Sequence, residues 1–202
     1  MTPITPEKQT RPTFKSRVRA SGRWFSLTGL LLTAVCFLLP FAMVSCDAPG
    51  GYGRVKAGGS TTYTGIDLVT GGSPDVTKTH LRPVEEQQED QLPPQPLAIA
   101  AFVLVVAGGI AVVAFRDKNA RRPFVALASA IAAVFLAATA IAVNATLEAR
   151  VSEQLTVAMP VGKTPADFVH VGNGLALALV LACVTAVANA LAWLIGKRRP
   201  DG

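Results

Sequence analysis

The chain has 202 residues, of which half are hydrophobic and 16% are charged, and its formal net charge is +6. A soluble domain usually carries about a quarter charged residues, so this composition excludes an ordinary soluble protein. The positive net charge does not indicate binding to nucleic acid, because the cations are confined to particular segments of the chain.

Four apolar stretches divide the chain, and none of them contains Asp, Glu, Lys, Arg or His. Each is about 20 residues long, and at about 1.5 Å per residue a helix of that length matches a bilayer core of roughly 30 Å. The pattern predicts an all-α membrane protein, built as a bundle of four transmembrane helices. The apolar stretches are residues 24–44, 97–115, 124–145 and 174–195.

With their flanking residues, these stretches give nine predicted segments. The first is a basic cytoplasmic tail without apolar periodicity, which is expected to be disordered. In chain order the segments are the tail (1–22), helix one (23–45), a first extracellular loop with a β-hairpin and an acidic, proline-rich linker (46–96), helix two (97–115), a cytoplasmic loop (116–123), helix three (124–146), a second extracellular loop with one strand (147–173), helix four (174–196) and a cytoplasmic tail (197–202).

The distribution of cations predicts the orientation of the helices. Of the 19 Lys and Arg residues, 13 lie in the N-terminal region up to Arg23, in the 116–123 loop and at the C-terminus. The two other loops hold six, together with ten of the 13 acids. Lys and Arg are enriched in cytoplasmic loops. Both termini and the 116–123 loop are therefore expected in the cytoplasm, as part of a multi-pass protein of the cell membrane.

The end of the first apolar stretch allows two interpretations. Residues 43–46, Met-Val-Ser-Cys, loosely resemble the sequence at which bacterial lipoproteins are cleaved and lipidated on cysteine. A secretory signal usually spans about 15–30 residues with a short apolar core, whereas this stretch is long enough to cross a membrane. A retained helix is favoured, with Pro40 kinking or ending it near the outer surface. Lipidation of Cys46 stays open.

The two outer loops are expected to form one small antiparallel sheet. In the first loop, residues 54–57 and 61–70 are rich in Thr, Val, Ile and Tyr and are punctuated by glycine pairs, which predicts a hairpin. In the second loop, apolar and other residues alternate over 155–161, which predicts a strand with one apolar face. A lone strand leaves its backbone groups unpaired, so this strand should pair with the hairpin. Phe168, Val169 and Val171 would pack beneath the sheet.

Small residues recur on the predicted helices and favour close helix packing. The second helix carries the pair Gly108-Gly109. The remaining small residues recur four apart, either as one stripe on the fourth helix or as pairs on the third: Ala178, Ala182, Ala186 and Ala190, and Ala126 with Ala130 and Ala133 with Ala137. A generic alanine-rich composition explains the same pattern equally well.

Polar residues and cysteines are sparse in the spans. Asn144 and Asn189 are the strongest polar groups, and an asparagine there usually donates or accepts a hydrogen bond across helices. Weaker groups are Thr33, Ser129, Thr139 and Thr185. Cys36 and Cys183 are expected at similar depths as small buried hydrophobes, and whether they touch stays open.

The sequence offers no catalytic, cofactor-binding or metal-binding residue. No nucleophile stands beside a base at motif spacing, and the spans hold no ionisable residue of the kind that coupled transporters and proton relays generally keep. His80 and His170 have no ligand-like neighbours. The protein is therefore not expected to be an enzyme or to bind a cofactor or small-molecule substrate.

Residues 39–46, Leu-Pro-Phe-Ala-Met-Val-Ser-Cys, and 63–71, Tyr-Thr-Gly-Ile-Asp-Leu-Val-Thr-Gly, carry a resemblance. They are similar to a pattern in uncharacterised, actinobacterial-type four-pass membrane proteins, which covers the first third of the chain and implies no activity. The loop layout also resembles that of claudins, although their Trp and paired-Cys signature is absent from the first outer loop, so this likeness concerns architecture alone.

Two functions from different classes remain. The favoured one is a structural or protein-interaction component of the bacterial cell membrane. Its partners are expected to be the lipid bilayer and, through the alanine-rich helix faces, another membrane protein or a second copy of the chain. The alternative is a subunit of a small oligomeric transporter or channel, although the spans lack the continuous polar stripe that a conductive pore needs.

Overall fold

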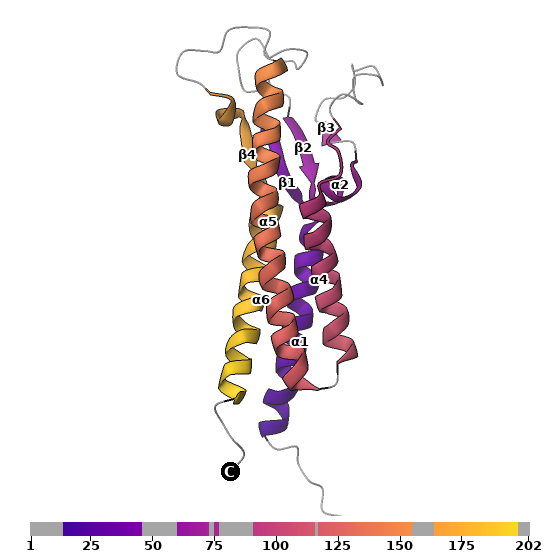
Figure 1. The fold of residues 1–202 in the computed structure, drawn as a ribbon, viewed down its shortest axis with the longest axis vertical. Coiled ribbons are helices and arrows are strands. Elements are labelled where there is room, and N and C mark those ends of the chain that lie inside the picture. The colour runs from indigo at the N-terminus through magenta and orange to yellow at the C-terminus, as the bar shows by residue number, and fades with distance from the viewer. Residues whose placement is uncertain are drawn as a thin grey trace, which may run out of the picture.

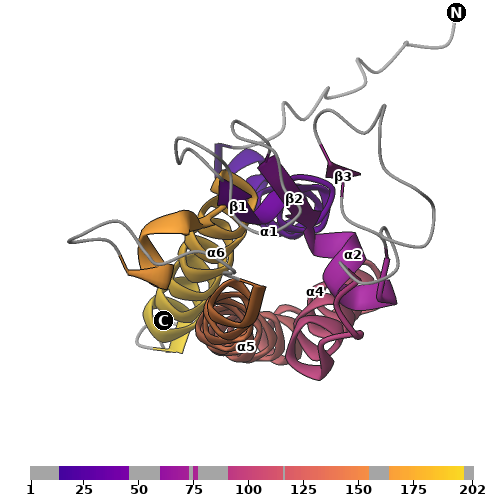
Figure 2. The same ribbon diagram turned by 90° about the horizontal axis from the view of Figure 1, so that it is seen from above.

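The computed structural model describes residues 14–45, 60–72, 75–76, 91–115, 117–154 and 164–197. Long helices stand side by side, and a small sheet lies at one end of them (Figure 1). Seen along their length the helices form a ring in which α6 lies between α1 and α5, and α4 lies between α5 and α1 (Figure 2). Their bounds are α1 (Phe14–Cys36), α4 (Pro96–Ala114), α5 (Lys118–Gln154) and α6 (Asn173–Lys197).

Within the described residues, α4, α5 and α6 are the helices long and apolar enough to cross a membrane. The bounds of α4 and α6 confirm the helices predicted over 97–115 and 174–196 to within one residue. Large apolar side chains point outward from these helices, such as Val103, Val134 and Leu191, which are 56%, 65% and 53% exposed. Such an outward apolar face is unfavourable in water and favourable in the core of a lipid bilayer.

The predicted start and end of the third helix, at residues 124 and 146, are both wrong. Helix α5 begins at Lys118, so most of the expected 116–123 loop is helical, and the connection from α4 is three residues long. At the other end α5 continues to Gln154. Val143 and Leu147, four residues apart, are buried on one face of the helix, so the apolar face continues beyond residue 146 although the sequence there becomes polar. Its 37 residues span about 55 Å, so α5 projects well beyond a bilayer core of roughly 30 Å.

The first predicted helix, over residues 23–45, is also wrong at both ends. Helix α1 begins at Phe14, inside the expected disordered tail, and ends at Cys36. Its apolar part, Arg23–Cys36, is shorter than a bilayer core requires. Three tight-turn hydrogen bonds follow, from the amides of residues 37–39 to the carbonyls of residues 34–36. Pro40 then ends the helix, because it has no amide hydrogen and disfavours a helical conformation at Leu39.

The residues after this turn form the strand β1 (Pro40–Ser45), which lies inside the sheet. The strand order is β3-β2-β1-β4, with β2 (Ser60–Thr64), β3 (Asp75–Val76) and β4 (Val169–Val171), and every pairing is antiparallel. On β1, Val44 stands opposite Thr61 of β2 and Val169 of β4. The expected small antiparallel sheet is therefore present, but its central strand comes from the first apolar stretch.

The other predicted strands need correction. The 61–70 strand ends at Thr64 and continues as the helix α2 (Gly65–Thr70). Val169 and Val171 belong to β4 instead of packing beneath the sheet, while Phe168, in the short helix η2 (Pro165–Phe168), is buried as expected. The predicted strands at 54–57 and 155–161 lie outside the described residues, as do the acidic run 85–90 and Cys46.

A capping box explains why α2 forms. The Asp67 carboxylate accepts a hydrogen bond from the Thr64 backbone amide at 2.8 Å, and the Thr64 hydroxyl oxygen accepts one from the Asp67 amide at 3.2 Å. This reciprocal arrangement satisfies amides that a helix start leaves unpaired. Gly71 closes the helix in the left-handed region, at φ 74°.

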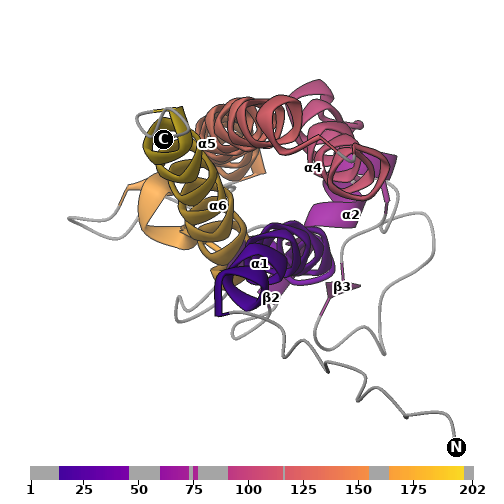
Figure 3. The same cartoon turned by 90° about the horizontal axis from the view of Figure 1, so that it is seen from below.

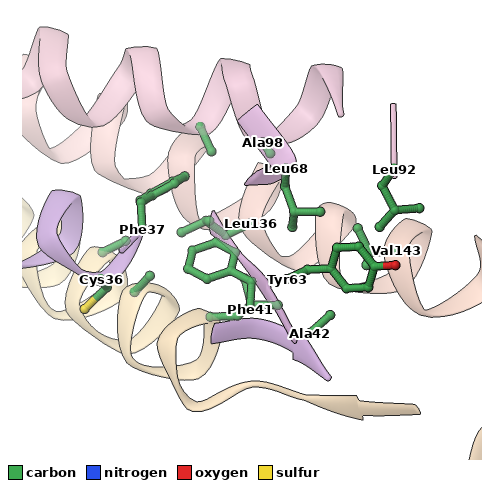
Figure 4. Close-up of a cluster of buried hydrophobic side chains, with 14 of the residues drawn as sticks. Cys36, Phe37, Phe41, Ala42, Tyr63, Leu68, Leu92, Ala98, Leu136 and Val143 are labelled. Atoms are coloured by element: carbon green, nitrogen blue, oxygen red, sulfur yellow. The ribbon is translucent and has the colours of Figure 1, made fainter. Parts of the chain in front are cut away.

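The main core cluster lies where the sheet meets the helices (Figure 4). Phe37 and Phe41 are almost fully buried, with ring centroids 5.0 Å apart, and Phe37 also packs edge-on against Phe102 of α4 at 5.1 Å. Tyr63 of β2 and Leu68 of α2 complete the contact between sheet and bundle (Figure 4). The sheet is therefore packed onto the bundle through one shared core.

Two close approaches join the beginning of α6 to the turn after α1. The Gly172 amide donates to the Phe41 carbonyl at 2.8 Å. A Cβ atom at Gly174 would lie 2.6 Å from the Leu39 Cβ and 2.7 Å from the Pro40 carbonyl oxygen. Only glycine fits at this contact without displacing backbone.

Candidate functional site

Metal-ligating side chains do not cluster in the described part of the chain. Among the described residues, no group of three or more His, Cys, Asp or Glu side chains lies close enough to hold a metal ion. His170 is exposed on β4, and His80 is outside the described residues. Helix contacts, an arginine cluster and an apolar groove are the candidate sites in the described part of the chain.

A buried polar contact joins α1 to α6 in the half of the bundle away from the sheet. The Ser26 hydroxyl donates to Asn189 Oδ1 at 2.9 Å, and Asn189 Nδ2 donates to the Thr185 carbonyl at 2.8 Å. All three residues are buried, and a Cβ at Gly29 would lie 2.5 Å from Thr185 Oγ1. This arrangement confirms Asn189 as a residue that bonds across helices, and Gly29, which sequence analysis did not single out, is what lets α1 approach α6.

The other polar residues of the spans behave differently. Thr33 and Thr139 donate to carbonyls four residues earlier in their own helices, Gly29 and Phe135. Asn144 is half-buried on α5. Ser129 is buried on α5, and its hydroxyl has no hydrogen-bond partner among the described residues.

The alanine patterns are right on one helix and wrong on the other. Ala178, Ala182 and Ala186 are buried on α6, so this stripe is a packing face. On α5, Ala130 and Ala137 are exposed, which contradicts the two predicted pairs. The buried face of α5 mixes small residues, among them Ala133 of the second pair, with larger ones: Val125, Ala128, Ser129, Ala132, Ala133 and Leu136.

The two cysteines within the helices are free thiols in different environments. Cys36 is buried at the end of α1, as expected for a small hydrophobe. Cys183 is exposed on α6, which contradicts the expectation that it is buried.

Three arginines, Arg23, Arg121 and Arg122, lie close together at the end of the bundle opposite the sheet. Figure 3 shows the helices from that end. Arg23 of α1 donates from Nη2 to the Val113 carbonyl of α4 at 3.0 Å, and Arg122 of α5 donates from Nη1 to the Ala192 carbonyl of α6 at 2.9 Å. Arg121 lies within electrostatic range of both other arginines and is only 7% exposed. In the sequence, the positions of these cations indicated only the orientation of the helices.

An apolar groove of about 500 Å³ lies between α1 and α4. Leu27, Leu31 and Ala34 of α1 face it, together with Ile110 and Val113 of α4 and other apolar residues of both helices. Val113 both lines the groove and accepts the hydrogen bond of Arg23, so the arginines lie at the end of the groove that is away from the sheet.

The two glycines of the pair on α4 lie in different environments: Gly108 packs against α1, and Gly109 lines the groove. A Cβ at Gly108 would be 3.3 Å from Leu30 Cδ1. Gly108 therefore lets Leu30 of α1 pack close to α4, which is the role predicted for a small residue on this helix. A Cβ at Gly109 would meet nothing within 4 Å, because Gly109 faces the open groove.

Taken together, the apolar helices and their outward-facing side chains define an integral membrane protein that carries a small antiparallel sheet at one end of its bundle. No known protein-family model matches the chain, and no curated protein matches it.

Proposed function

We propose that the protein is a structural or protein-interaction component of the bacterial cell membrane, with the sheet outside and both termini in the cytoplasm. The sheet is the surface through which it contacts a partner. The observation that carries this proposal is the direct connection of the sheet to the bundle. Three residues separate α1 from β1, and one residue separates β4 from α6. The helices therefore hold the sheet in a fixed position.

Charge and exposure support the choice of this surface. The cation distribution favours a cytoplasmic location for the opposite end of the bundle. On β4, His170 and Val171 are exposed, and Val171 is an apolar side chain 49% exposed. A retained first helix agrees with this proposal, because cleavage before Cys46 would remove β1 and leave β2 and β4 without the strand that lies between them.

The test is photo-crosslinking in intact cells. A photoreactive residue placed at position 170 should give a discrete protein adduct, and the matched control at position 134, on the outward face of α5, should give lipid adducts. Protein adducts from position 134 alone would move the interaction surface into the membrane and contradict the proposal. Protein adducts from neither position would contradict an interaction role.

The alternative is a subunit of a small transporter or channel, and one observation favours it. In the described part of the bundle, the Ser129 hydroxyl is a buried polar group without a hydrogen-bond partner. Such a group is rare in a packed interior and often has a functional explanation. Ion flux through purified protein in vesicles, lost in Ser129→Ala, would establish this alternative.

A further inference from the structure

The groove between α1 and α4 has the size and chemistry of a ligand site. Its volume of about 500 Å³ falls within the range of roughly 300–1,000 Å³ that is typical of small-molecule sites. Its lining is apolar and it opens toward the surface that lipid covers, so the part of a ligand that fills it must be a hydrocarbon chain. The groove-lining residues from Val105 to Val113 extend along about 12 Å of α4.

The arginines at the end of the groove identify the other part of the ligand. Arg121 has little exposed surface, and Arg23 and Arg122 place two further positive charges within electrostatic range of it. Like charges held this close repel one another. Arg23 uses one Nη2 contact to Val113, and a guanidinium has five donors, so it keeps donors for a second acceptor. An anion placed near Arg23 and Arg121 removes the repulsion, and guanidinium groups fit the geometry of phosphate well.

We propose that the α1–α4 groove binds one anionic phospholipid, with a hydrocarbon chain along Leu31 and Ile110 and the phosphate held by Arg23 and Arg121. The charge of the headgroup distinguishes this ligand from a zwitterionic lipid of the bulk membrane. The site does not depend on the proposed interaction role, because it lies at the opposite end of the bundle from the sheet.

Native mass spectrometry of the full-length protein in detergent tests the proposal. Dioleoyl phosphatidylglycerol and dioleoyl phosphatidylcholine are the probes, because they carry identical chains and differ in headgroup charge. Phosphatidylglycerol should bind as one tightly held copy. Arg23→Gln and Arg121→Gln should each weaken its binding about fivefold, while Lys197→Gln, which removes an exposed cation at the same end of the bundle, should change it less than twofold.

The groove itself is tested by filling it. Gly109→Leu adds a side chain into open space and should weaken the binding of both lipids, whereas Ala130→Leu, at an exposed position on α5 outside the groove, should leave binding unchanged. Thermal unfolding of each variant without lipid confirms that it is folded. If Arg121→Gln does not fold, Arg23→Gln and Gly109→Leu decide the outcome.

Three results would overturn the proposal. The first is equal affinity for the two lipids. The second is an equal loss of phosphatidylglycerol binding in Arg23→Gln and Lys197→Gln. The cations would then attract anionic lipid only through the overall positive charge of this end of the bundle, and not through a specific site. The third is a dimer that forms without lipid and is lost in Gly109→Leu, because a second copy of the chain then occupies the groove.

Discussion

Replacing Phe41 by alanine tests the central claim that the first apolar stretch ends in a buried strand. Phe41 is 1% exposed, and the centroid of its ring lies 5.0 Å from that of Phe37. The ring also packs closely against Gly65, because a Cβ atom added at Gly65 would lie 2.9 Å from Phe41 Cε1. Truncation of a buried phenylalanine costs about 3–5 kcal/mol, which includes the lost transfer energy and the cavity. We expect Phe41→Ala to lower the free energy of unfolding by about 4 kcal/mol, near the middle of that range.

Leu38→Ala is the matched control, because Leu38 is also a large apolar residue of the same segment but is 65% exposed. We expect it to change the free energy of unfolding by about 0.5 kcal/mol or less. Unfolding in detergent micelles, followed by circular dichroism, measures both variants. At roughly 2–4 °C per kcal/mol, Phe41→Ala should lower Tm by about 8–16 °C. Equal losses from the two substitutions would refute the buried strand, since both residues would then face the same environment.

Three further predictions test other parts of the fold. Gly174→Ala should destabilise the protein by about 1–3 kcal/mol, because the added methyl group clashes with the turn after α1. Gly109→Ala should stabilise it by about 0.5–1 kcal/mol, because the groove leaves room for the methyl group. If thermal unfolding gave the reverse order, the packing of α6 against this turn and the open groove at Gly109 would both be contradicted. Thr64→Ala should cost about 0.5–2 kcal/mol by removing the cap of α2, with earlier hydrogen exchange of the α2 amides as the local signature, and unchanged exchange would show that the cap is dispensable. For orientation, a membrane-impermeant thiol reagent added to intact cells should label Ala166→Cys and not Ala120→Cys, and the opposite labelling would invert the proposed topology.

The three long helices were predictable because their signal is composition over many residues. An uninterrupted apolar run of about 20 residues has few alternatives in a membrane. The boundaries were harder to predict, because they depend on local packing. Helix α5 continues past residue 146 since Leu147 stays buried against the rest of the protein, and no hydropathy value records that contact.

The strand β1 was missed because hydropathy does not distinguish a buried strand from a transmembrane helix. Residues 40–45 are as apolar as the residues before them, and Pro40 was interpreted as a kink or an end without a new element behind it. The capping pattern at Thr64 and Asp67 was a usable signal for α2, but the preference of Ile66 and Val69 for strands outweighed it.

The candidate site was predictable in its residue types and not in its geometry. Asn189 stood out as a polar group in an apolar run, and it bonds to Ser26 as such residues usually do. The arginine cluster was not foreseen, because Arg23 and Arg121 are distant in sequence and meet only through the arrangement of α1 and α5. The groove likewise depends on how far α1 and α4 separate, which follows from the packing of every helix in the ring.

The position of β1 has a consequence for the order in which the protein is made. Ribosomal synthesis delivers β1 early and β4 late, directly before the last helix. Until β4 is synthesised, one edge of β1 has no partner strand for its amides and carbonyls, which is the condition that promotes pairing with a foreign chain. Closing this edge joins segments from opposite ends of the sequence, and such distant contacts form slowly. Completion of the sheet therefore waits for a segment that is made near the end of synthesis, and a chain that stalls before β4 keeps this edge of β1 open to other strands.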